Sequence, residues 1–127
     1  MNRIENYAEL ETSIVTWIQN YVNENKLKSL VVGVSGGIDS AVVATLCAET
    51  GIPTYVLSMP LKSSAKNDTL SDSYTTYLEN NYDNVTKIRI DLGAVYQTFI
   101  TTFDLWTSKE EYTGSGLVNA NTKSRMR

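Results

Sequence analysis

The spacing of apolar residues predicts a chain that alternates helices with short strands. Between Ile4 and Val22 the apolar residues recur every three or four positions, which is the period of a helix with one apolar face. Residues Leu30–Val34 form an almost wholly apolar run of β-branched character, typical of a strand buried on both faces of a parallel sheet. The chain is therefore expected to begin with an amphipathic helix followed by a buried strand.

The rest of the chain continues this alternation. A helix is expected to begin at Asp39 or Ser40 and to stop at Gly51, because glycine commonly follows the last helical turn. Thr54–Ser58 and Val85–Ile90 have the composition of two further strands. The other expected elements are a polar loop over residues 62–72, helices over 71–78 and 92–103, and a mobile loop over 113–121.

Strands that alternate with helices of this length imply right-handed crossovers between parallel strands. We therefore expect an α/β fold with a doubly wound parallel sheet, preceded by the N-terminal helix. Three strands make a narrow sheet, and the sequence stops at Arg127 just as a basic segment begins what reads as another helix. Residues 1–127 are thus expected to be the N-terminal portion of a single domain, truncated at its C-terminus.

Composition restricts the chemistry open to this chain. Eleven basic and fourteen acidic residues give a net charge of −3 without a clustered basic face, so nucleic acid is not an expected partner. No apolar stretch has the length of a signal peptide or a membrane span, which favours a cytoplasmic protein without a membrane partner. Histidine is absent and Cys47 is the single cysteine, which excludes Ser-His-Asp and Cys-His chemistry within this chain.

The most informative segment is Gly33–Ser40, which lies between the first strand and the helix after it. In open α/β sheets, ligands bind outside the carboxyl ends of strands, where the next helix presents its first amides and its positive dipole end to an anion. Adjacent glycines suggest a positive φ or a ligand lying close to the backbone, and the Ser35 and Ser40 hydroxyls add donors. The predicted phosphate-binding residues are Gly33, Val34, Ser35, Gly36, Gly37, Ile38, Asp39 and Ser40.

Asp39 is the unusual member of this loop. A carboxylate beside a phosphate is repulsive unless a cation lies between them, and an oxygen-seeking Mg²⁺ suits that position. We therefore assign Asp39 to magnesium.

Two common nucleotide-binding loops do not fit this segment. A Walker A loop needs a lysine, and neither lysine nor arginine occurs between Ser29 and Leu61. A dinucleotide fingerprint that begins at Gly33 needs glycine where Ser35 and Ile38 stand. The remaining alternative to a phosphate site is a tight turn without a ligand.

The segment Ser35–Ser40 resembles the Ser-Gly-Gly-x-Asp-Ser loop of the ATP pyrophosphatase superfamily, whose members cleave ATP between its α and β phosphates. Within that superfamily, Met59–Leu61, Lys62–Ser64 and Asn121–Arg127 resemble NAD synthetases. The last of these segments is similar to the family's Asn-x-Lys-Ala-Arg-x-Arg-Met, with Ser124 in place of alanine and without the final methionine. The resemblance places a second metal ligand and part of the nucleotide contacts beyond Arg127.

The resemblance implies an ammonia-dependent NAD synthetase with an adenine nucleotide alpha hydrolase-like fold. In that family, the carboxylate of deamido-NAD attacks the α-phosphorus of ATP to give an adenylate and pyrophosphate, and ammonia then displaces AMP. By this resemblance Gly33–Ser40 hold ATP, Asp39 carries Mg²⁺, Arg125 contacts deamido-NAD, and the complete protein is a homodimer. No side chain here is expected to be a catalytic nucleophile, and the 127-residue piece alone is expected to be inactive.

Two alternatives remain open from the sequence. One is another ligase of the same superfamily, such as a GMP synthetase-like or tRNA-modifying enzyme. The other is an ATP-binding module without catalysis.

Overall fold

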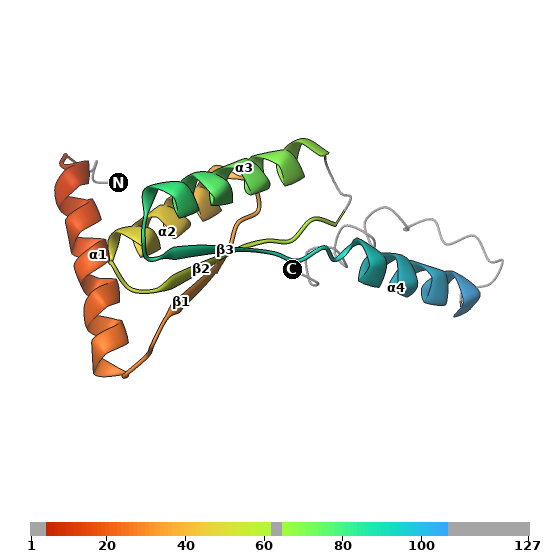
Figure 1. Ribbon diagram of the computed structural model, residues 1–127, viewed down its shortest axis with the longest axis horizontal. Coiled ribbons are helices and arrows are strands. Elements are labelled where there is room, and N and C mark those ends of the chain that lie inside the picture. The colour runs from red at the N-terminus through yellow and green to blue at the C-terminus, as the bar shows by residue number, and fades with distance from the viewer. Residues whose placement is uncertain (1–4, 62–64, 107–127) are drawn as a thin grey trace.

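The computed structural model describes residues 5–61 and 65–106, with the side chains of 65–67 and 104–106 excepted. Helices and strands alternate along this part of the chain, as the apolar spacing predicts (Figure 1). In chain order the elements are α1 Tyr7–Glu24, β1 Leu30–Gly33, α2 Ile38–Glu49, β2 Thr54–Ser58, α3 Ala65–Asn81, β3 Val85–Arg89 and α4 Gly93–Trp106. The expected loop over 113–121 and the expected C-terminal helix lie outside the described residues.

The three strands form one parallel sheet in the order β1-β2-β3. Val56 in the central strand pairs with Val32 on one side and with Lys87 on the other. All three strands therefore end at the same edge of the sheet, where ligands bind in open α/β folds. The α/β class and the parallel sheet are confirmed.

Helices α2 and α3 both lie on one face of this sheet (Figure 1). This follows from the strand order, because two right-handed crossovers that advance in the same direction place their helices on the same side. The core fills the space between these helices and the strands. It consists of Val34, Ala44, Ala48, Val56, Leu78 and Val85.

The expectation that the first strand is buried on both faces is wrong for the described residues. Val31 in β1 is 63 % exposed, and its neighbour in the sheet, Tyr55 in β2, is 38 % exposed. Both side chains point to the face opposite α2 and α3, because side chains alternate along a strand. An apolar run shows that a strand is buried somewhere, but it does not show which helices cover it.

The expected loop over 62–72 is also wrong over most of its length, because α3 already begins at Ala65. The buried stripe of α3 consists of Ser71, Thr75 and Leu78, at the i, i+4, i+7 spacing of a helix face. The helix expected over 71–78 is thus present but longer than predicted, because two of these three residues carry hydroxyl groups and the apolar pattern does not fix its bounds. The hydroxyl of Thr75 is satisfied inside the helix by the carbonyls of Ser71 and Asp72, at 2.9 and 3.0 Å.

Helix α1 packs against α2 and is fixed at both ends. The side chain of Asn6 accepts a hydrogen bond from the amide of Glu9 at 3.1 Å and so caps the first turn. Near the other end Val22 is buried, and Gln19 Nε2 donates to the carbonyl of Thr50 at 2.9 Å. The predicted N-terminal helix is therefore confirmed, and a hydrogen bond joins it to the C-cap residue of α2.

Helix α4 follows β3 and extends beyond the carboxyl edge of the sheet (Figure 1). Val95 and Phe99 are exposed on it, and the ring of Phe99 stacks on that of Phe103 with centroids 6.2 Å apart. Its start is fixed by the amide of Leu92, which donates to the carbonyl of Pro60 at 3.0 Å. None of the helices in the described residues is long and apolar enough to cross a membrane.

Candidate phosphate-binding site

The predicted phosphate loop lies where β1 passes into α2. Beyond the last strand residue the β ladder continues for one position, because the amide of Val34 donates to the carbonyl of Leu57 at 2.9 Å. The chain then turns through Ser35 and Gly36, and Gly37 is the N-cap of α2. The strand, turn and helix that the sequence predicts are thus present in the expected order.

The two glycines of the turn have different backbone requirements. Gly36 has a φ of +93°, a conformation that other residues adopt only with strain. Gly37 has an ordinary extended backbone with a φ of −87°, and a Cβ placed there would lie 3.5 Å from the Oγ of Ser35. The backbone of the free loop therefore accounts for glycine at position 36 but not at position 37.

The hydroxyls of Ser35 and Ser40 close the loop on itself. The two Oγ atoms lie 3.0 Å apart, and Ser40 Oγ also accepts a hydrogen bond from the amide of Ser35 at 3.0 Å. The amide of Gly37 donates to Ser35 Oγ at 3.3 Å, and Ser40 Oγ donates to the carbonyl of Gly37 at 3.3 Å. All four contacts are exposed, so a phosphate oxygen that approaches from solvent can replace the serine oxygens as an acceptor.

The first turn of α2 adds a second source of donors. Gly37 has no side chain, and none of the side chains described in the structure caps this helix. The amides of the first turn and the positive end of the helix dipole therefore face the loop. Asp39 lies in the same turn and is exposed, so its carboxylate competes with an anion for this position unless a cation joins them.

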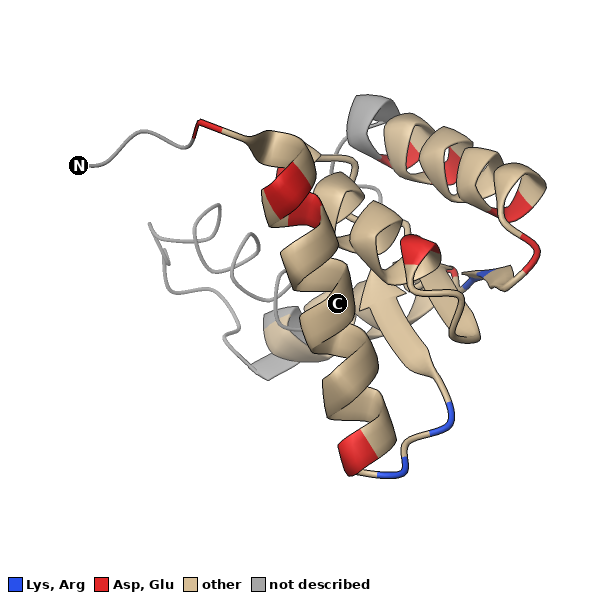
Figure 2. Cartoon of the chain, turned by 90° about the vertical axis from the view of Figure 1, so that its left-hand side faces the viewer, with Lys and Arg blue, Asp and Glu red and all other residues tan. Residues whose placement is uncertain are grey.

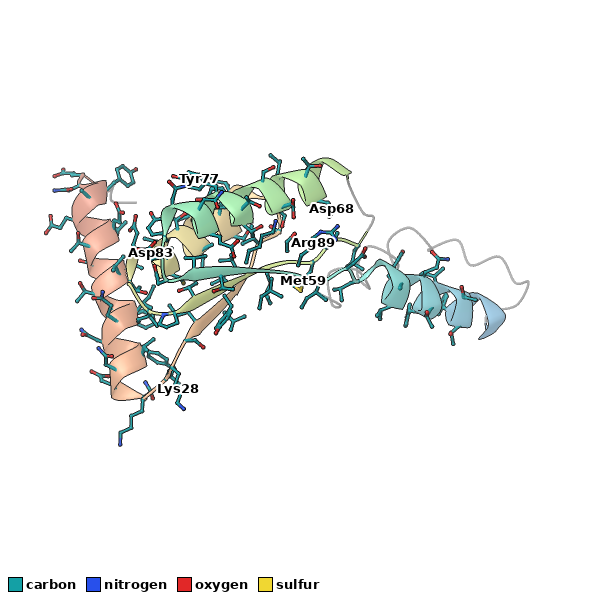
Figure 3. The ribbon with its side chains drawn as sticks, in the orientation of Figure 1. Lys28, Met59, Asp68, Tyr77, Asp83 and Arg89 are labelled. Atoms are coloured by element: carbon teal, nitrogen blue, oxygen red, sulfur yellow. The ribbon has the colours of Figure 1, made fainter. Side chains whose placement is uncertain are left out.

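A small cavity of about 150 Å³ lies beside the loop. Its lining residues are Gly33, Val34, Ser35, Met59, Asp68 and Ser71. Met59 follows the end of β2, while Asp68 and Ser71 come from α3. Figure 3 shows Met59, Asp68 and the Arg89 side chain at this same end of the sheet.

The sequence does not identify Asp68 and Ser71 as neighbours of the loop, because Asp68 falls in the expected polar loop and Ser71 at the start of the expected helix over 71–78. For Met59 the sequence does contain a signal. Met59 directly follows a predicted strand, so it is expected at the carboxyl edge of the sheet, beside the loop.

Positive charge is scarce around the loop. Among the side chains that the structure describes, the basic ones lie in the turn after α1 and on β3, whereas acidic ones occur on each of the first three helices (Figure 2). On β3, Lys87 Nζ is 2.7 Å from Asp72 Oδ1, and Arg89 Nε is 3.9 Å from the same oxygen. The described donors at this loop are therefore backbone amides, serine hydroxyls and the positive end of the helix dipole.

Cys47 does not contribute to this chemistry. It is buried on α2, and burial raises the pKa of its thiol, so the reactive thiolate is disfavoured.

The segments that carry the rest of the sequence resemblance are not described. Lys62–Ser64 and Asn121–Arg127, which include the predicted substrate contact Arg125, lie outside the described residues. The structure therefore brings together the predicted residues from Gly33 to Ser40, and it places Arg125 neither near them nor away from them.

Comparison with known proteins decides the family. Residues 10–127 match the family model described as NAD synthase. The chain belongs to the NAD synthase family. An NH(3)-dependent NAD(+) synthetase of Finegoldia magna is 35 % identical over 100 residues, which cover 78 % of this chain and 39 % of that protein. A second, from Saccharolobus solfataricus, is 34 % identical over 114 residues, which cover 90 % of this chain and 37 % of that protein.

Solved structures agree on the fold. A structure named as the NMN synthetase of Francisella tularensis is 25 % identical, with a TM-score of 0.74, and the match covers 94 % of this chain and 45 % of that one. The chain spans less than half the length of the curated relatives just described. The NAD synthase fold, with its parallel sheet and helices, is thereby confirmed for this chain.

Proposed function

We propose that the complete protein catalyses the ATP-dependent amidation of deamido-NAD to NAD with ammonia. The reaction would proceed through an adenylate and release AMP and pyrophosphate. The family match supports this proposal, and one structural observation carries it: at the carboxyl edge of a parallel sheet, a loop with two glycines holds amides and hydroxyls at an exposed position, in hydrogen bonds to serine oxygens that a phosphate oxygen can replace.

The loop from Gly33 to Ser40 would hold the phosphates of ATP. Attack of a carboxylate on the α-phosphorus needs in-line positioning and neutralisation of charge more than it needs a protein nucleophile. Amides that are fixed in place before the reaction supply such neutralisation without reorganisation. A chain without histidine, whose cysteine is buried, is suited to this kind of catalysis.

Asp39 is proposed as a ligand of Mg²⁺. Within the described residues no group of three acidic, cysteine or histidine side chains could enclose a metal ion, so the protein would supply few ligands at this position. Mg²⁺ suits such a site, because it commonly binds one or two carboxylates and takes its remaining ligands from phosphate oxygens and water. The ion would offset the repulsion between the Asp39 carboxylate and the phosphates.

The remaining assignments extend the proposal to the complete protein. We assign residues 1–127 to the N-terminal portion of a single synthetase domain, with Arg125 as a contact to deamido-NAD. The protein would be a cytoplasmic homodimer that takes ATP, deamido-NAD and ammonia as substrates. The exposed apolar residues Val95 and Phe99 on α4 support self-association, since apolar surface of this kind favours burial against a partner.

Turnover by the complete protein tests the function. With ATP, Mg²⁺ and an ammonium salt, deamido-NAD should yield NAD and AMP in equal amounts. Because one structural neighbour is named NMN synthetase, the mononucleotide counterpart of deamido-NAD is assayed in parallel. If the protein binds ATP but forms no AMP with either acceptor substrate, the synthetase function is rejected and an ATP-binding module without catalysis is favoured.

The metal assignment has its own test. The Asp39→Asn variant should lose most of its activity at low Mg²⁺ and recover part of it when the concentration is raised. The Asp83→Asn variant is a suitable control, because Asp83 is exposed in the turn before β3, at the opposite edge of the sheet. Equal dependence on Mg²⁺ in both variants would reject Asp39 as a ligand.

A further inference from the structure

A buried serine on α3 contacts the backbone immediately before the phosphate loop. Ser71 is only 4 % exposed, and its Oγ donates to the carbonyl oxygen of Val34 at 2.6 Å. The same Oγ lies 3.2 Å from the Oγ of Ser58 at the end of β2. A single hydroxyl thus connects α3 with the carboxyl ends of two neighbouring strands.

The hydroxyl of Ser71 has one proton to donate. The carbonyl of Val34 is the closer of its two neighbours, so the proton points mainly to that oxygen. On its other side, Val34 is held through its own amide, which donates to the carbonyl of Leu57 at 2.9 Å. The backbone at Val34 is therefore fixed both by the sheet and by α3.

The carbonyl of Val34 and the amide of Ser35 belong to the same peptide group. A peptide group is planar and trans, so its C=O and N–H point in opposite directions. When Ser71 holds the carbonyl toward α3, the amide of Ser35 must point away from α3, into the loop. There the amide donates to Ser40 Oγ at 3.0 Å, which is the observed contact.

We propose that Ser71 is a positioning residue, whose buried hydroxyl holds the Val34–Ser35 peptide so that its amide, rather than its carbonyl, faces the phosphates of ATP. This inference rests on the proposed function of the loop. Rotation of the same peptide would turn a carbonyl oxygen toward the phosphates, where it repels them. Ser71 prevents this rotation by holding the carbonyl of Val34 on the side of α3.

The test compares four variants of the complete protein. Ser71→Ala removes the hydroxyl, whereas Ser71→Thr and Ser71→Val have the same shape and differ only in the hydroxyl. Thr75→Val is the matched control, because Thr75 is also buried on α3 but bonds only to carbonyls of its own helix. Each variant is assayed for kcat, for KM of ATP and of ammonia, and for its thermal unfolding midpoint.

Removal of the hydroxyl should raise the KM for ATP about ten-fold, as expected for one hydrogen bond that fixes a binding group. Ser71→Ala and Ser71→Val should show this rise, while Ser71→Thr stays near the wild type and the KM for ammonia is unchanged. Thr75→Val should change the unfolding midpoint without changing the KM for ATP. Equal KM values for ATP in the Thr and Val variants would overturn the proposal.

A measurement independent of turnover follows the peptide itself. In ¹⁵N-labelled protein, the Ser35 amide should exchange with solvent faster in Ser71→Ala and Ser71→Val than in Ser71→Thr, because the peptide is no longer fixed. Unchanged exchange would overturn the positioning role even if activity falls. Absence of ATP turnover in the wild type would instead reject the proposed function, and the Ser35 amide would still report whether Ser71 holds this peptide.

Discussion

The two adjacent glycines of the loop allow a sharp separation of folding from ligand binding. Gly36→Ala places a side chain on a residue with a φ of +93°, which costs about 1–3 kcal/mol of unfolding free energy. For a domain of the size expected of the complete protein, about 2 kcal/mol corresponds to a fall of roughly 6 °C in the unfolding midpoint. Gly36→Ala should therefore be measurably less stable than the wild type.

Gly37→Ala should behave differently. The backbone there suits any residue, and the new Cβ would make only an ordinary contact, 3.5 Å from Ser35 Oγ. Alanine is a poorer N-cap than glycine by roughly 0.5–1 kcal/mol, but it lowers the entropy of the unfolded chain by an amount worth about 0.4–1 kcal/mol. These effects nearly cancel, so the unfolding free energy should change by less than about 0.5 kcal/mol.

ATP binding should be impaired in Gly37→Ala, although this substitution leaves the unfolding free energy nearly unchanged. If phosphate oxygens approach the backbone at Gly37, the added methyl group separates them from the amides, and the KM for ATP should rise about ten-fold or more, equivalent to 1.4 kcal/mol. Urea unfolding and ATP titration of the complete protein provide both measurements. A Gly37→Ala variant that is as destabilised as Gly36→Ala, or that has the wild-type KM for ATP, would contradict these roles of the two glycines.

Three further predictions concern the supporting structure. The pKa of Glu49 is raised above its usual 4.5, chiefly by a hydrogen bond with Glu11 and to a smaller extent by burial and by the charge of Glu11. The stabilisation that Glu49 contributes is therefore present below pH 4.5 and is lost as the pH rises through the raised pKa. Glu49→Gln should therefore flatten the fall of the unfolding midpoint above pH 4.5. Asn84 Nδ2 donates to two backbone carbonyls at 2.9 and 2.8 Å, so Asn84→Ala should lose about 1–2 kcal/mol of unfolding free energy without changing the KM for ATP. The pair of Lys87 and Asp72 is partly exposed, so Asp72→Asn should lose no more than about 1 kcal/mol, and less at high salt.

Each of these predictions has a result that contradicts it. An identical pH profile for the wild type and the Glu49→Gln variant would show that the two carboxyl groups do not interact. A raised KM for ATP in Asn84→Ala would show that the amino edge of the sheet influences the loop. A loss for Asp72→Asn that does not depend on salt would indicate that hydrogen bonds, rather than charge, hold Lys87.

Structural features that depend on a few neighbouring residues can be predicted from this sequence, and features that depend on packing cannot. Gly51 was expected to end α2, and it follows the C-cap of that helix with a φ of +75°, a requirement that a few neighbouring residues impose. The strand Thr54–Ser58 was also predicted with the bounds that the structure gives. The helix expected over 71–78 is present as α3, but its bounds are not predicted, because its buried face carries Ser71 and Thr75 and apolar spacing does not show where it begins.

The candidate site also has a part that the sequence predicts and a part that it does not. The order of strand, glycine turn and helix can be read from Gly33 to Ser40, because each step depends on adjacent residues. The neighbours of that turn could not be predicted, since Met59 lies one crossover further along the chain, and Asp68 and Ser71 lie on α3, within the second crossover. Which face of the sheet is covered also depends on the handedness of those crossovers.

Local signals account for the succession of helices and strands and for the glycine turn between β1 and α2, because periodicity, capping and backbone freedom act over a few residues. The contact between the hydroxyl of Ser71 and the carbonyl of Val34, 37 positions apart, arises only from the packing of α3 on the sheet. The same packing also leaves Val31 and Tyr55 exposed on the face opposite α2 and α3. Contacts of this kind depend on how the elements pack, and the pattern of residues within each element does not contain that information.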